Sequence, residues 1–129
     1  MDTGRLTLSL LPGTYAVARL DPADAWPAWA LGAPGLVALA RTDDELSVIC
    51  REEAVPAGTP SQRGWRALKV HGPFPFDTVG VLASLAGVLA EAGVSLLAVS
   101  TYDTVYLLVR QEQLTEAVAA LSARHAVLT

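Results

Sequence analysis

The strongest constraint on the fold is the order of hydrophobic patterns in the second half of the chain. Residues 65–72 alternate between two faces, as in a β-strand, whereas residues 78–92 carry apolar side chains at the spacing of an amphipathic helix that ends before Gly93. Two strand-like runs, a second helical pattern and a last short strand follow, at residues 94–100, 104–110, 111–124 and 126–128. This order predicts a βαββαβ, ferredoxin-like unit.

The start of the first predicted helix has the features of an anion-binding site. Asp77 or Thr78 can accept hydrogen bonds from the first helical amides. The remaining free amides, which we expect at Val79, Gly80 and Val81, would suit a carboxylate. Gly80 has no side chain and therefore allows a close approach to the backbone.

A second polar segment, Ser-Thr-Tyr-Asp-Thr at residues 100–104, lies at the predicted bend between two apolar strands. Asp103 is a common turn former, so a purely structural role is one interpretation. A tight turn needs only a few residues, however, and this segment places hydroxyl groups and a carboxylate on adjacent positions. We therefore also expect it to bind a small zwitterion, with the helix start of a second copy brought into reach at the sheet edge. The candidate ligand-binding residues are Phe76, Asp77, Thr78, Val79, Gly80, Val81, Ser100, Thr101, Tyr102, Asp103 and Thr104.

The first half of the chain is predicted to be rich in β-structure, with four strand-like runs at residues 6–11, 14–20, 35–41 and 46–52. Pro12 and Gly13 suit a type II turn, so we expect the first two runs to form a hairpin. The polar residues 42–45 predict a second hairpin. Residues 21–22 predict the start of a short helix, and residues 54–64 have the composition of a linker.

Residues 76–114 resemble ACT-domain proteins, and most closely the small tandem-ACT group related to the cytosolic arginine sensors called CASTOR. ACT domains are βαββαβ regulatory modules that usually bind amino acids at the interface between two modules. Their strand-to-helix loop commonly reads Asp-x-Pro-Gly-x-Leu. Asp77, Gly80 and Leu82 match this pattern, and Val79 stands where the proline usually is.

The resemblance implies an α+β protein of two ferredoxin-like, ACT-type units. Residues 1–60 would form a degenerate unit, and residues 64–129 an ACT domain. It also implies a non-catalytic regulatory module, present as a homodimer, that binds a free amino acid or similar small zwitterion at an ACT–ACT interface. The alternative is an ACT-like dimerisation or protein-interaction module without a ligand.

Composition narrows the classes of function. The 129 residues include 13 acidic and 9 basic side chains and show no basic patch, which argues against nucleic-acid or membrane partners. With one cysteine, Cys50, and two histidines, no intramolecular disulfide and no metal site is expected. No nucleophile or paired-carboxylate motif accompanies His71 or His125, so we expect neither an enzyme nor a cofactor. The chain lacks a signal-like or membrane-spanning hydrophobic stretch, which predicts a cytoplasmic protein.

Overall fold

The computed structural model describes residues 4–74 and 80–129, and the chain forms two compact units. Unit 1 combines the N-terminal segment up to Leu11 with the segment from Arg66 to the C-terminus, and unit 2 spans Pro12–Trp65. The strand β5 (Ser61–Val70) contributes its first half to unit 2 and its second half to unit 1. This grouping differs from the expected segments 1–60 and 64–129, because the first strand belongs to unit 1.

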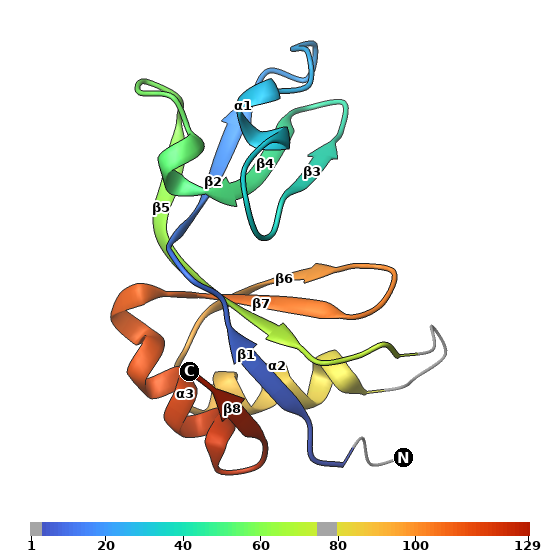
Figure 1. The fold of residues 1–129 in the computed structure, drawn as a ribbon, viewed down its shortest axis with the longest axis vertical. Coiled ribbons are helices and arrows are strands. Elements are labelled where there is room, and N and C mark those ends of the chain that lie inside the picture. The colour runs from blue at the N-terminus through green and yellow to red at the C-terminus, as the bar shows by residue number, and fades with distance from the viewer. Residues whose placement is uncertain (1–3, 75–79) are drawn as a thin grey trace. The chain divides into compact units, whose positions relative to one another are not determined.

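Unit 1 has the predicted α+β, ferredoxin-like fold. Its elements besides β5 are β1 (Thr7–Leu10), α2 (Val81–Glu91), β6 (Leu96–Ser100), β7 (Val105–Arg110), a short 3-10 helix η2 (Gln111–Gln113), α3 (Leu114–Ser122) and β8 (Ala126–Leu128). From β5 onward they follow the predicted order of strand, helix, strand, strand, helix, strand. The sheet order is β6-β7-β5-β1-β8 (Figure 1). β1 is inserted between the first and last strands of the βαββαβ unit, antiparallel to β5 and parallel to β8.

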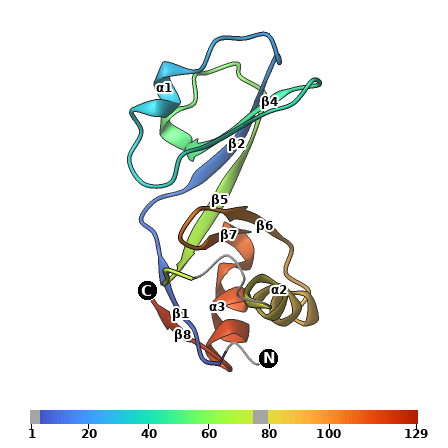
Figure 2. The ribbon, with the colours of Figure 1, turned by 90° about the vertical axis from the view of Figure 1, so that its right-hand side faces the viewer.

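The core of unit 1 lies between this sheet and its two helices. Leu85 and Leu89 of α2 and Leu121 of α3 are fully buried in one apolar cluster with strand residues such as Leu8 and Leu107. Figures 1 and 2 show both helices on the same side of the sheet. The amphipathic spacing read from the sequence therefore corresponds to the buried faces of these helices.

The end of α2 is closed as the sequence predicts. Gly93 has a φ of 75°, which favours glycine, and its N–H donates to the Ala90 carbonyl. The next N–H, of Val94, donates to the Leu89 carbonyl over 3.0 Å, which completes a Schellman motif. Val94 and Leu89 are both buried in the core, so the same motif directs the chain from α2 toward β6.

Unit 2 has the same strand order with reduced helices. Its elements are β2 (Tyr15–Leu20), α1 (Ala28–Leu31), β3 (Ala38–Arg41), β4 (Leu46–Arg51), the 3-10 helix η1 (Glu52–Ala54) and the first half of β5, and the strands lie in the order β3-β4-β2-β5. This is the βαββαβ order with one turn of helix at each helical position. The sequence-based description of a degenerate first unit is therefore confirmed.

Two hairpins were predicted in the first half, and only the second is present. β3 and β4 pair as expected, and the Thr42 hydroxyl accepts the N–H groups of Asp44 and Glu45 in their turn. The prediction of a hairpin around Pro12 and Gly13 is wrong, because β1 and β2 do not pair with each other. β1 pairs with β5 and β8, whereas β2 pairs with β4 and β5. Ten residues of β5 offer pairing positions to both strands, which a local turn signal cannot reveal.

Two other local predictions also need correction. α1 begins after Pro27, not at residues 21–22, and the Asp21 carboxylate instead accepts the N–H of Ala23 in a local turn. The predicted linker 54–64 ends in strand, because β5 begins at Ser61. Within the described residues, no helix is both long enough and apolar enough to cross a membrane.

A candidate ligand pocket in unit 1

The first turn of α2 begins two residues later than the sequence suggested. Gly80 precedes the helix with a φ of 87°, and its carbonyl accepts the N–H of Ser84 over 2.9 Å. Gly80 therefore caps the helix, and the amides of its first turn belong to Val81, Leu82 and Ala83 rather than to Val79–Val81. The candidates Phe76, Asp77, Thr78 and Val79 lie outside the described residues.

The β6–β7 turn is shaped by two of its threonines. The Thr101 hydroxyl accepts the N–H of Thr104 over 3.2 Å, and the Thr101 N–H donates to the Thr104 carbonyl over 2.8 Å. The Thr104 hydroxyl in turn donates to the Val70 carbonyl of β5 over 2.6 Å. These two hydroxyl groups thus have the structural role that a turn former would have. Ser100, Tyr102 and Asp103 are exposed.

The segment after β5 packs closely against this turn. The N–H of Phe74 donates to the Asp103 carbonyl over 2.8 Å. A Cβ atom on Gly72 would lie 2.8 Å from the same carbonyl oxygen, which is closer than van der Waals contact allows. Glycine at position 72 is therefore what lets the β5 end approach the turn.

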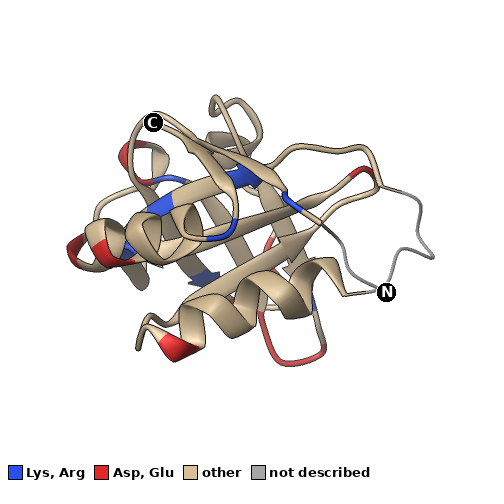
Figure 3. Cartoon of the chain, turned by 90° about the horizontal axis from the view of Figure 1, so that it is seen from below, with Lys and Arg blue, Asp and Glu red and all other residues tan. Residues whose placement is uncertain are grey.

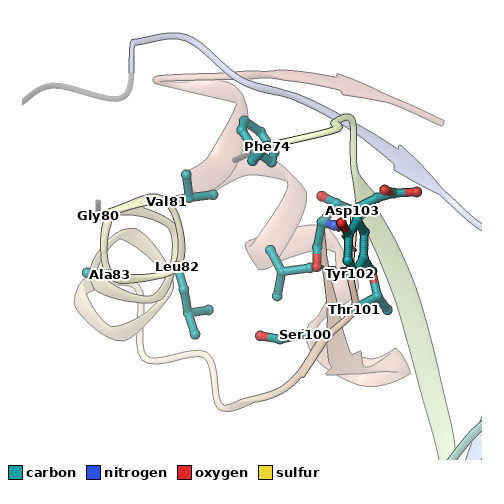
Figure 4. A pocket seen from close by; sticks show the side chains of 11 residues that line it. Phe74, Gly80, Val81, Leu82, Ala83, Ser100, Thr101, Tyr102 and Asp103 are labelled. Carbon is teal, nitrogen blue, oxygen red and sulfur yellow. Dashed lines mark hydrogen bonds between the residues drawn. The ribbon is translucent and has the colours of Figure 1, made fainter. Parts of the chain in front are cut away.

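The helix start and the turn line one pocket of about 320 Å³. Its described lining residues are Phe74, Gly80, Val81, Leu82, Ala83, Ser100, Thr101, Tyr102, Asp103, Thr104 and Val105. In Figure 4 the side chains of Val81 and Leu82 extend from α2 toward Ser100 and the turn, with Phe74 beside them. The described residues of the two segments selected from the sequence, Gly80, Val81 and residues 100–104, thus line one pocket in a single chain. From the sequence, a second copy was expected to bring them into reach.

Two polar side chains of the pocket are available for a ligand. The Ser100 hydroxyl and the Asp103 carboxylate make no hydrogen bond or ion pair with another described residue. α2 carries one charged residue, Glu91, which is its last residue and is not among the lining residues of the pocket. Figure 3 shows this helix in tan except for the red acidic position at its end. The local charges on the described lining are therefore the Asp103 carboxylate and the partial positive charge of the helix start.

Four of the described lining residues were not among the candidates from the sequence: Phe74, Leu82, Ala83 and Val105. Leu82 falls within the apolar helical pattern of residues 78–92, yet its side chain is 38% exposed. Its place in the Asp-x-Pro-Gly-x-Leu pattern was the available signal. Phe74 follows β5 in a segment without periodicity, so nothing in the sequence indicated its position.

The other polar groups that could suggest chemistry have structural partners. His71 is exposed and hydrogen-bonded to Ser9 over 2.5 Å, whereas His125 is buried and its Nδ1 accepts the N–H of Leu6. Cys50 is buried, and this burial, together with the charge of Glu53, raises the pKa of its thiol. The described residues contain no group of three or more potential metal ligands.

A second hollow, of about 310 Å³, lies in unit 2 beside β2, β4 and β5. Its charged side chains already have partners. Arg19 donates to the Asp44 carbonyl over 2.9 Å, and Glu45 accepts the Ser47 hydroxyl over 2.6 Å. The pocket in unit 1 is therefore the stronger candidate site.

Fold and pocket together define an α+β protein built from ferredoxin-like units, and comparisons with known proteins identify the family. Residues 60–123 match the ACT domain profile, and residues 13–58 match a profile for an N-terminal domain. A crystal structure of an Agobacterium tumefaciens protein is 38% identical, with a TM-score of 0.90 over 98% of this chain and 94% of that one. The chain belongs to the ACT-domain family.

More distant structures share the fold. A Vibrio cholerae protein of unknown function, described as a possible transport protein, is 22% identical, with a TM-score of 0.73 over 92% of this chain and 88% of that one. The ligand-free regulatory subunit of aspartate kinase from Thermus thermophilus is 12% identical, with a TM-score of 0.63 over 91% of this chain and 96% of that one. No curated protein matches the chain.

Proposed function

We propose that the protein is a non-catalytic regulatory module that binds a free amino acid, or a similar small zwitterion, in the pocket of unit 1. One observation carries this proposal: the start of α2 and the β6–β7 turn line the same pocket. The similarity in fold to an aspartate kinase regulatory subunit supports a regulatory role.

The pocket offers the two charges that a zwitterion requires. The amides of Val81, Leu82 and Ala83 at the helix start suit the ligand carboxylate. On the opposite side, the Asp103 carboxylate and the Ser100 hydroxyl suit the ammonium group. A volume of about 320 Å³ is at the lower end of the range for small-molecule sites, which fits a ligand of this size.

The proposed assembly is a homodimer in which a second ACT unit lies next to the pocket. Among the described strands β6 pairs only with β7, and its last residue, Ser100, lines the pocket. A second copy pairing along β6 would therefore border the bound ligand. A cytoplasmic location and a relation to the tandem-ACT group that includes CASTOR are parts of the same proposal, which includes neither nucleic acids nor membranes as partners.

A thermal-shift screen against the free amino acids tests the proposal. At about one hundred times its dissociation constant, a ligand should stabilise the protein by roughly 2.7 kcal/mol, which is a shift of several degrees. Asp103→Ala should remove most of this shift. Glu91→Ala, which removes an exposed carboxylate outside the pocket, should keep it. The proposal of an amino-acid-binding module fails if no amino acid changes the melting temperature, or if a ligand shifts the melting temperature of Asp103→Ala as much as that of the parent.

The second candidate function is a dimerisation or protein-interaction module without a ligand. Two features of β6 favour it. Among the described strands β6 pairs only with β7, so its other edge is unpaired, and it contains no charged residue or proline. Such edges readily pair with another strand. Light scattering should then show a dimer that Ala98→Lys in β6 weakens and Ala119→Lys on α3 leaves intact. A dimer without any ligand-induced shift would favour this function, whereas a monomer at high micromolar concentration would exclude it.

A further inference from the structure

Among the described residues that line the unit 1 pocket, none has a positively charged side chain. Of these described residues only Asp103 belongs to the charged residue types, Asp, Glu, Lys and Arg. An acidic ligand side chain would therefore lose its hydration without gaining a counter-ion, and Asp103 would repel it.

A basic ligand side chain meets a different difficulty. The ammonium group that every amino acid carries already needs a partner, and Asp103 is the one carboxylate among the described lining residues. A Lys or Arg side chain would then compete with the ammonium group for the same carboxylate. A buried charge without its own partner is costly, so this competition lowers affinity.

The remaining wall of the pocket is apolar. Phe74 and Val81 are partly buried and pack against the core of unit 1, so their position is supported from behind. Leu82 is 38% exposed and contributes the rest of this wall from the first turn of α2 (Figure 4). An apolar ligand side chain placed here would remove Leu82 and Phe74 from water, which is favourable in proportion to the area covered.

We infer that the pocket selects amino acids with an uncharged, apolar side chain, such as leucine, isoleucine, valine or methionine. This inference rests on the proposed function and specifies its ligand class. The carboxylate and ammonium groups account for recognition of any amino acid, and the wall formed by Phe74, Val81 and Leu82 accounts for the choice among them.

Isothermal titration with ligands of similar shape separates the inference from the proposed function. Leucine is compared with asparagine and aspartate, and methionine with glutamate and lysine, on the full chain. The apolar member of each set should bind at least about tenfold more tightly than the charged members. If aspartate, glutamate or lysine binds as tightly as the best apolar ligand, the inference is wrong and the proposed function stands. If no amino acid binds, the proposed function itself fails.

Leu82 allows a second test, because its exposure means that substitution should leave the fold intact. Leu82→Lys should weaken leucine or methionine binding about tenfold or more and improve binding of aspartate or glutamate relative to them. Leu31→Lys, at another exposed leucine in unit 2, is the matched control and should keep the parental preference. Melting curves without ligand confirm folding of both variants. An unchanged preference in Leu82→Lys would overturn the assignment of this wall.

Discussion

Gly72→Ala tests whether the close approach behind the pocket is as tight as the structure indicates. The added Cβ atom would lie 2.8 Å from the Asp103 carbonyl oxygen and 3.2 Å from the Thr104 Cβ atom. The nearest neighbour is backbone, so the turn must shift rather than a flexible side chain. Such overpacking costs about 1–3 kcal/mol. The shift would also weaken the hydrogen bond from the Phe74 N–H to Asp103, which is worth about 1 kcal/mol.

The matched control adds the same methyl group where the structure has room for it. Gly87 lies in α2, is exposed, and a Cβ atom there meets no atom within 4 Å. Replacing glycine by alanine within a helix should stabilise the protein by about 0.5–1 kcal/mol. Gly72→Ala and Gly87→Ala should therefore differ by about 3 kcal/mol in the free energy of unfolding, in opposite directions from the parent.

Urea unfolding followed by circular dichroism measures this difference, and thermal unfolding should separate the two variants by roughly 10 °C. Under the proposed function, Gly72→Ala should also lose the ligand-induced shift, because the Asp103 main chain must move. Gly87→Ala should keep it. Equal stability of Gly72→Ala and the parent would refute the argument that position 72 requires glycine.

Three further substitutions test the packing away from the pocket. Gly93→Ala forces a side chain into a φ of 75° and should cost about 1–2 kcal/mol by thermal unfolding, and no loss would contradict the Schellman ending of α2. Tyr15→Phe removes the acceptor of the buried Leu36 N–H and should lower the free energy of unfolding in urea by about 1–3 kcal/mol, and an unchanged value would contradict this role of the Tyr15 hydroxyl. Because burial raises the pKa of the Cys50 thiol, the unfolded state loses this proton first, and stability should fall as the pH rises above about 9. The free energy of unfolding of Cys50→Ala should fall less than that of the parent over the same pH range. Identical pH dependence of the two proteins would contradict the raised pKa.

The sequence predicted the elements of unit 1 well because their signals are local. The spacing of Leu85 and Leu89 defines the buried face of α2, and Gly93 marks its end through a backbone conformation that glycine favours. The polar run 100–104 likewise marked the turn between β6 and β7. Each of these signals depends only on residues that are close together in the sequence, so no tertiary information was needed.

The sequence also predicted part of the pocket lining on each of its two main elements, the start of α2 and the β6–β7 turn. Gly80, Val81 and residues 100–104 were selected for their polar groups and their helix-start position, and all of them line the pocket. Two residues of the apolar wall, Phe74 and Leu82, could not be selected in this way. An apolar side chain has the same sequence signature whether it faces a core or a ligand pocket, since both surfaces exclude water.

Two features of the sheet were decided by tertiary structure alone. One is the pairing of the first strand, β1, with the last strand, β8, and the other is the sharing of β5 between the two units. The insertion of β1 between β5 and β8 depends on pairing across about 60 and 120 residues of sequence, and Pro12 and Gly13 carry no information about it. The same holds for the meeting of the α2 start and the β6–β7 turn in one chain. Strand order is set by which backbone hydrogen bonds and buried faces are satisfied together, and this is a property of the whole sheet rather than of any segment.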